Sequence, residues 1–260
     1  MIQHNNRGIR YYTFNSFPAK GVIGACFTRL GGVSNEPYKS LNVGSSVGDQ
    51  KARVVQNRSK LFQAIGLPEE SMYDAWQVHS TDYVVAIEPR DLSSEQKKVD
   101  ILLTQNPSVT LMMRFADCVP IFLYDPKMRV VGLAHAGWMG SIHRIGSKAV
   151  DAMVKEFGCQ RDEIITAIGP SIGPDHYEVG IDVVEELTQN FRDQANEFLT
   201  IINNKCFLDL WGVNAFVLRE AGIRKIEIAK KCTACDVDEW YSHRKEKGKT
   251  GRFGAILSLA

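Results

Sequence analysis

Three residues of metal-binding type stand far apart in the chain: His79, Cys118 and His135. A thiolate and two imidazoles suit zinc, and three protein ligands leave a fourth coordination position for water or substrate. Three separate elements must converge for these side chains to meet. On spacing alone, Cys118 could equally be a buried core residue, and His79 and His135 could be structural histidines. The sequence therefore predicts an open, catalytic type of metal site, with a structural reading as the alternative.

Each candidate ligand lies where a predicted strand meets a turn, which is where a scaffold presents functional groups. The adjoining runs are short, apolar and rich in β-branched residues, and they cover residues 83–87, 110–114, 119–124 and 130–135. His79 precedes the first of these runs, Cys118 stands between the second and third, and His135 ends the fourth. The pattern predicts three strand ends that meet at one site.

The rest of the chain supplies further strands and four helices. Strand-like runs also cover residues 22–28, 164–168 and 225–229. Apolar residues at helical spacing predict helices over residues 50–65, 141–157, 181–192 and 210–221. Strands come in neighbouring pairs as often as they alternate with helices, which favours an α+β fold. We expect one domain over residues 1–260, in which mixed β-sheets are packed between helices in compact layers.

Composition excludes several classes of protein. Lys and Arg number 31 against 30 Asp and Glu, so the net charge of +1 gives no broad field for nucleic acid. No apolar stretch approaches the roughly 20 residues of a membrane helix, and the N-terminus lacks an apolar signal core. The six cysteines are scattered along the chain, unlike a small disulfide scaffold. We expect a cytoplasmic protein that binds neither nucleic acid nor membrane.

Several segments together resemble one family. They are Thr28-Arg-Leu-Gly-Gly-Val-Ser, Ser40-Leu-Asn-Val-Gly, Val47-Gly-Asp, Gln77-Val-His, Ala116-Asp-Cys-Val-Pro, His135-Ala-Gly-Trp, Ile168-Gly-Pro-Ser-Ile-Gly, Tyr177-Glu-Val-Gly, Cys232-Thr, Ser242-His-Arg and Thr250-Gly-Arg. In order and spacing they resemble the laccase-domain, or polyphenol-oxidase-like, family, which is described as zinc-dependent purine nucleoside phosphorylases. The resemblance spans nearly the whole chain, and the combination of segments is far more specific than any one of them.

The resemblance implies that His79, Cys118 and His135 are both the metal ligands and the catalytic centre, with zinc favoured over copper. It implies phosphorolysis of adenosine, inosine and methylthioadenosine to the free base and ribose 1-phosphate or its methylthio analogue, with adenosine deamination beside it. The partners would be purine nucleosides and phosphate, and the protein a monomer or homodimer. Met139 follows Trp138 where the family pattern usually has Arg, which removes the basis for an anion contact there.

Four further residues are candidate substrate contacts, each with a structural alternative. Arg29 precedes a Gly-Gly turn and suits an anion, but a solvated loop arginine explains it equally. The amide of Asn42 can both donate and accept, and it can also cap a turn. Arg58 falls inside the first predicted helix, where a surface salt bridge is the alternative. Tyr177 follows Gly173-Pro174, together with Glu178.

Other features need separate explanations. Asp117 could orient a ligand histidine, or cap a turn. Cys232 and Cys235 form a single CxxC without a second pair, so we expect no further ligands beside it and no second metal site. Gly248-Lys-Thr lacks the earlier glycine of a phosphate-binding loop, because His243 stands there. Met112 and Met113 belong to a strand core.

Three other functions remain open. Copper oxidation of polyphenols needs many histidines, whereas the chain has six, of which two lie in the candidate ligand set. A hydrolase could use Cys118 as its nucleophile with a histidine as base, and the resemblance allows such an enzyme to edit a cell-wall precursor. A non-enzymatic metal-binding protein would have a closed site.

Overall fold

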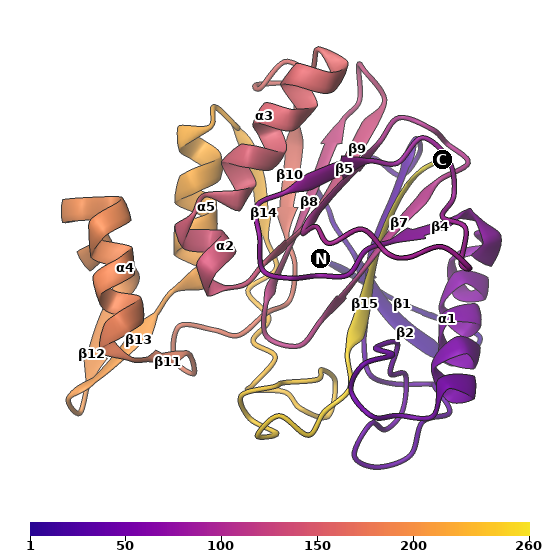
Figure 1. The fold of residues 1–260 in the computed structure, drawn as a ribbon, viewed down its shortest axis with the longest axis horizontal. Helices are drawn as coiled ribbons and strands as arrows, with labels where there is room; N and C mark the ends of the chain where they lie inside the picture. Colours follow the sequence, from indigo (N-terminus) through magenta and orange to yellow (C-terminus); the bar gives the residue numbers. More distant parts are fainter.

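Two six-stranded sheets packed face to face form the centre of the molecule, and helices cover their outer faces (Figure 1). The computed structural model describes residues 1–260. The first sheet has the strand order β1 (Ile2–Asn6), β2 (Ile9–Thr13), β3 (Val22–Phe27), β15 (Phe253–Leu259), β7 (Thr110–Phe115) and β4 (Met72–Asp74). The second has the order β14 (Lys225–Ile228), β10 (Ile165–Ile168), β8 (Val119–Asp125), β9 (Val130–Ala136), β6 (Ile101–Thr104) and β5 (Tyr83–Val85).

The remaining elements lie outside these sheets. The helices are α1 (Lys51–Ile65), α2 (Trp138–Ile142), α3 (Ile145–Phe157), α4 (Ile181–Phe191) and α5 (Leu210–Glu220), with 3₁₀ turns η1 (Glu69–Ser71) and η2 (Arg192–Phe198). A small sheet has the order β11 (Glu178–Val179), β13 (Lys205–Leu208) and β12 (Leu199–Ile202). Figure 1 shows this sheet and α4 standing to one side of the two large sheets. No helix is long and apolar enough to cross a membrane.

Three hydrophobic clusters connect the layers. One fills the space between the two large sheets, a second lies between the first sheet and α1, and a third lies between the second sheet and the helices α2, α3 and α5. Every residue of β8 and β9 is buried, because these strands are covered on both faces. In β7, Met112 packs toward α1 while Met113 faces the second sheet, as alternation along a strand requires. Both are core residues, as predicted.

The layered α+β fold predicted from the sequence is confirmed. All seven predicted strands and four predicted helical regions are present. The predicted helix over residues 141–157 is two helices, since it begins earlier, at Trp138, and breaks after Ile142. Arg144 has a φ of 62° at this break, a left-handed conformation that no helix can continue through.

The chain crosses between the two large sheets at two connections that matter for the site. One leads from β4 in the first sheet to β5 in the second and contains His79. The other leads from β7 to β8 and contains Cys118. His135 lies near the end of β9, and its register partner in β8 is Pro120, two residues from Cys118. The two crossings therefore bring distant segments to one edge of the sandwich.

Candidate active site

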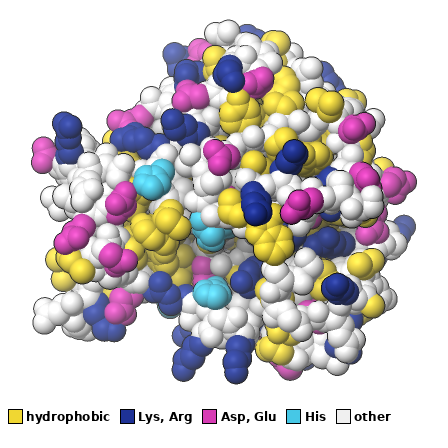
Figure 2. Space-filling model, viewed as in Figure 1, with side chains coloured by type: hydrophobic (Ala, Val, Ile, Leu, Met, Phe, Trp, Pro, Cys, Tyr) yellow, Lys and Arg dark blue, Asp and Glu magenta, His cyan; other side chains and the backbone are white.

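A cavity of about 410 Å³ lies where the chain crosses between the sheets. Figure 2 shows this face of the molecule hollowed, with histidine side chains at the hollow. Fourteen residues line the cavity: Gly44, Ser46, Trp76, Gln77, His79, Arg114, Ala116, Asp117, Cys118, His135, Tyr177, His243, Arg244 and Arg252. They come from six separate parts of the sequence, so only the folded chain creates this surface.

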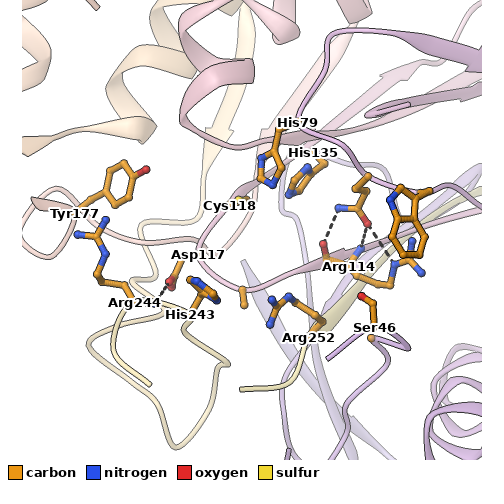
Figure 3. Close-up of a pocket in the computed structure, with 14 residues that line it drawn as sticks. Ser46, His79, Arg114, Asp117, Cys118, His135, Tyr177, His243, Arg244 and Arg252 are labelled. Carbon is orange, nitrogen blue, oxygen red and sulfur yellow. Dashed lines mark hydrogen bonds between the residues drawn. The ribbon is translucent and has the colours of Figure 1, made fainter. Parts of the chain in front are cut away.

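The three candidate metal ligands meet in this cavity. The ligand atoms of His79, Cys118 and His135 all lie within 4.8 Å of one another. The two imidazole rings are 4.9 Å apart between centroids and inclined at 65°. Figure 3 shows the three side chains directed toward a common space. The donor types and their proximity fit a zinc ion with a further position left for water or substrate.

Asp100 organises both histidines, a role that no pattern in the sequence indicates. Its Oδ1 lies 2.8 Å from Nδ1 of His135, which leaves Nε2 as the nitrogen available to a metal. Its Oδ2 accepts hydrogen bonds from the backbone of Val78 and Ser80, at 3.1 and 2.7 Å. These bonds flank His79, whose φ of 62° is left-handed. A carboxylate behind a histidine is the usual way to fix the tautomer and orientation of a metal ligand.

Gly137 leaves the space in which the ligands meet. A Cβ at this position would lie 2.5 Å from Nδ1 of His79 and 3.4 Å from Sγ of Cys118. The first distance is far below a van der Waals contact, so any other residue would displace the imidazole. The backbone therefore approaches the ligand group as closely as only glycine allows.

The two histidines differ in their affinity for protons. Burial opposes protonation of His135, but the Cys118 thiolate and the Asp100 carboxylate outweigh burial and raise its pKa to about 9. The pKa of His79 is lowered by burial and by the charge of His135, with Asp100 acting in the opposite sense. Without a metal, the surroundings of His135 thus favour its imidazolium form, whereas those of His79 favour its neutral form.

Basic side chains form the wall next to the candidate ligands. Arg114, Arg244 and Arg252 line the cavity together with His243, and Figure 3 shows these groups around the space below the two ligand histidines. Burial lowers the pKa of Arg114 to about 10 and also lowers that of Arg252. Guanidinium groups that line a cavity and are poorly solvated, as those of Arg114 and Arg252 are, suit an anion such as phosphate.

Neighbouring residues hold these arginines in place. Gln77 pairs with the backbone of Arg114, with its Nε2 2.8 Å from the carbonyl oxygen and its Oε1 3.0 Å from the amide nitrogen. The backbone amide of Arg244 donates to Oδ2 of Asp117 at 2.6 Å. Oδ1 of Asp117 accepts from the hydroxyl of Thr233 at 2.7 Å. Asp117 therefore anchors a distant loop, and neither a histidine-orienting role nor a local turn cap describes it.

Asn42 lies behind the cavity wall and does not line the cavity. It is fully buried, and its Oδ1 accepts hydrogen bonds from the backbone of Gly44 and Arg252, at 2.9 and 2.8 Å. Its Nδ2 donates to Asp49 at 2.9 Å. The structure thus gives Asn42 a positioning role, because it joins two segments that do line the cavity.

Arg29 and Arg58 also lie away from the cavity. Arg29 donates to the backbone oxygens of Lys39 and Val237, pairs with Glu246 at 3.0 Å and stacks on the ring of Tyr241. Arg58 donates to the carbonyl of Val43 and lies 3.9 Å from Asp74. Both are largely buried, so the alternatives of a solvated loop arginine and a surface salt bridge are wrong as well.

Tyr177 does line the cavity, with the guanidinium of Arg244 4.9 Å from its ring centre. Burial raises the pKa of its hydroxyl, so this group stays protonated. Glu178 contributes through its backbone, whose oxygen accepts from Arg244, while its carboxylate pairs with Lys205 at 2.8 Å. Trp76, which the sequence did not single out, is 46% exposed at the cavity.

The expectation that the CxxC pair has no partner ligands is wrong. Asp175 and His176 lie beside Cys232 and Cys235, and the ligand atoms of all four are within 4.8 Å of one another. Sequence spacing could not reveal this group, since more than fifty positions separate its two halves. The group does not line the cavity.

Comparison with known proteins places the chain among related sequences and structures. Residues 24–260 match the family model described as multi-copper polyphenol oxidoreductase laccase. A purine nucleoside phosphorylase of Deinococcus radiodurans is 35% identical over 93% of this chain and 91% of that protein. Purine nucleoside phosphorylase YlmD of Bacillus subtilis is 33% identical over 92% and 89%. The crystal structure of YlmD from Geobacillus stearothermophilus superposes with a TM-score of 0.92 at 32% identity, covering 99% of this chain and 98% of that one.

Proposed function

Because this chain belongs to the multi-copper polyphenol oxidoreductase laccase family, we propose that it is a zinc-dependent purine nucleoside phosphorylase. Relatives that align over nearly their whole length bear the name of that activity. One observation carries the proposal: a group of three zinc-type ligands and three arginines line the same cavity. A phosphorylase must bind phosphate beside the bond that breaks, and the arginines next to the ligand group offer such a site.

The basic wall is the proposed phosphate site. Arg114, Arg244 and Arg252 would hold the anion through charge-assisted hydrogen bonds, and their fixed backbones would orient it. Zinc bound by His79, Cys118 and His135 would supply Lewis-acid polarisation of an oxygen on phosphate or water. The exposed ring of Trp76 offers a flat apolar face on which a purine can stack.

The reaction then follows from these positions. An oxygen of the bound phosphate attacks the anomeric carbon of the nucleoside as the bond to the purine nitrogen breaks. The electron pair of that bond leaves with the purine, which takes up a proton, and the sugar departs as ribose 1-phosphate. The arginines hold the attacking phosphate in line, so that a bimolecular attack becomes effectively intramolecular.

We extend the proposal to three substrates and a second reaction. Adenosine and inosine differ only on the purine, and methylthioadenosine differs at the far end of the sugar, so one phosphate site serves all three. In adenosine deamination, water instead attacks carbon 6 of the purine, the bond to the exocyclic nitrogen breaks, and ammonia leaves while the glycosidic bond stays intact. Zinc is favoured over copper, because only two histidines belong to the ligand group in the cavity, too few for a multicopper centre.

One observation favours a second candidate. Cys118, His135 and Asp100 are arranged as nucleophile, base and orienting carboxylate, with 2.8 Å between His135 and Asp100. This is the constellation of a cysteine hydrolase, including one that edits a cell-wall precursor. Such an enzyme would act without metal and would ignore phosphate.

Product chromatography with adenosine distinguishes the two. The phosphorylase should release adenine and ribose 1-phosphate only when phosphate is present, and should release hypoxanthine from inosine in the same way. Chelation of zinc should abolish both, and restored zinc should recover them. Deamination to inosine should persist without phosphate.

Equal release of adenine with and without phosphate would exclude phosphorolysis and leave hydrolysis. Activity that survives complete removal of zinc would favour the cysteine hydrolase. Elemental analysis of protein purified without added metal checks the metal itself. Stoichiometric copper with little zinc would revive the oxidase function.

A further inference from the structure

A second group of metal-type side chains lies outside the cavity. It consists of Asp175 and His176, from the loop between β10 and β11, and of Cys232 and Cys235, from the loop after β14. Two thiols, an imidazole and a carboxylate make four donors, enough to fill a tetrahedral zinc site from the protein alone. Neither the proposed reaction nor the comparisons account for this group.

The distances between the donors match those of a tetrahedral zinc ion. With Zn–S near 2.3 Å and Zn–N or Zn–O near 2.0–2.1 Å, tetrahedral angles put sulfur about 3.5 Å from nitrogen or oxygen, and nitrogen about 3.3 Å from oxygen. Nδ1 of His176 lies 3.8 Å from Sγ of Cys232 and 3.5 Å from Sγ of Cys235. Oδ2 of Asp175 lies 3.7 Å from Sγ of Cys235 and 3.0 Å from Nδ1 of His176. Each separation is within about 0.3 Å of the tetrahedral value.

The backbone around the group is also arranged for a thiolate. The amide nitrogen of Gly173 donates to Sγ of Cys232 at 3.1 Å. A Cβ at Gly173 would lie 2.7 Å from Oδ1 of Asp175 and 3.2 Å from Sγ of Cys232. A side chain at position 173 would therefore press on the Asp175 carboxylate and on the Cys232 sulfur where they now lie. Outer hydrogen bonds to a ligand sulfur support the charge that a bound metal requires.

We propose that Asp175, His176, Cys232 and Cys235 bind a second zinc ion in a closed, structural site. Binding would release the two thiol protons to solvent. With every position filled by protein, this ion leaves no room for substrate, in contrast to the three-ligand group in the cavity.

The proposed site joins two loops that end in the cavity wall. Backbone bonds already connect Ser171 with Lys231 and with Thr233. Tyr177 directly follows the ligand His176, and Arg244 stacks on Tyr177 and is held through Asp117, which also binds Thr233. A zinc ion at this point would fix both loops and would thereby hold Tyr177 and Arg244 at the cavity.

Metal stoichiometry tests the proposal without any measurement of activity. Wild-type protein should contain about two zinc ions per chain, and Cys118→Ser should retain about one. Cys232→Ser and Cys235→Ser should each lose about one, whichever reaction the cavity performs. Cys206→Ser is the matched control, because Cys206 is a half-buried free cysteine in β13 that belongs to neither group.

A titration of metal-free wild-type protein covers the case in which a variant fails to fold. Cobalt should bind in two stages, one of which shows the intense thiolate charge-transfer absorption of a two-cysteine site. In Cys118→Ser that stage should remain. Hydrogen exchange at residues 171–178 and 231–235 should slow when zinc is added to this variant.

Three results would overturn the proposal. The first is one zinc per chain in wild type with no change in Cys235→Ser. The second is a single cobalt stage that disappears in Cys118→Ser. The third is a Cys232–Cys235 disulfide in protein purified under reducing conditions.

Discussion

At the scale of single residues, the sequence indicated the candidate ligands but little of what surrounds them. His79, Cys118 and His135 have distinctive chemistry and stand at strand ends, so residue type and local pattern predicted them. Asp100, Arg244 and Arg252 look like ordinary charged residues in the sequence, and the family segments containing the two arginines suggested no role. Their partners lie between 20 and 210 positions away. The role of such residues depends on contacts between distant segments, which only the folded structure shows.

The contribution of Asp100 to zinc binding in the cavity can be measured. Asp100→Asn keeps the shape of the side chain but removes the carboxylate that holds Nδ1 of His135 and so fixes the orientation of the ring. We expect zinc affinity in the cavity to fall about 10- to 100-fold, the usual effect of removing such an outer partner. Competition with a chromogenic chelator measures it in the Cys232→Ser background. Asp125→Asn is the control, because Asp125 is equally buried and accepts two backbone hydrogen bonds away from the site. Equal affinity in both variants would remove Asp100 from the site.

Two glycines three positions apart offer a second test. Gly137→Ala would place a methyl group 2.5 Å from His79, so zinc content at the cavity site should fall markedly. Gly140→Ala meets its nearest neighbour at 3.5 Å, an ordinary contact, within α2. There alanine should keep zinc content and leave stability unchanged or raise it by about 0.4–1 kcal/mol. Elemental analysis and thermal unfolding check both variants, and full zinc in Gly137→Ala would contradict the packing argument.

At the scale of elements, most long apolar strands were predictable from the sequence, whereas short strands such as β6 and polar edge strands were missed. β8 and β9 are buried runs whose pattern is clear in the sequence. β1, with the sequence Ile-Gln-His-Asn-Asn, is an exposed edge strand that hydrophobic patterning cannot detect. β15 contains Gly254 and Ser258, which weaken a strand signal, although it lies at the centre of the first sheet. Its pairing with distant strands overrides its local preference.

A charged cluster at the end of β4 connects this strand with β7 and α1. It reaches the cavity through Arg114. Asp74 is buried and lies 2.7 Å from Arg90, 3.5 Å from Arg114 and 3.9 Å from Arg58. Arg114 belongs to β7 and Arg58 to α1. The Asp74 carboxylate therefore offsets the positive charge of arginines that are largely shielded from water.

Asp74→Asn should lower the free energy of unfolding by about 3–5 kcal/mol, because it leaves buried guanidinium groups without a counter-charge. Asp151→Asn is the control. It removes a 2.7 Å pair with Arg161 on the surface, where both side chains are more than 40% exposed, and should cost about 0–1 kcal/mol. Urea unfolding measures both changes. A loss below about 1 kcal/mol in Asp74→Asn would mean that the arginines are solvated after all.

At the scale of the whole molecule, two sheets share one cavity because two of the four crossings between them, β4–β5 and β7–β8, meet there. The first connection contributes His79 and the second contributes Cys118. The ligand group therefore forms only when the two sheets are correctly packed against each other. The basic wall consists of Arg114, which belongs to β7 of the first sheet, and of Arg244 and Arg252, which lie in the segment before β15. Zinc binding in the cavity is thus coupled to the packing of the entire sandwich, and protein loaded with zinc should unfold at a higher temperature than metal-free protein.

The position of β15 has a consequence for synthesis of the chain. Residues 253–259 pair on one side with residues 22–27 and on the other with residues 110–115. Until β15 has left the ribosome, β3 and β7 each present an unpaired edge to solvent, and Arg252 has not yet reached the cavity. Long-range pairing of this kind folds slowly and leaves apolar edges exposed. Nascent chains stalled before residue 253 should therefore be sensitive to protease and bound by chaperones, whereas release of the last strand should complete the sheet and the basic wall together.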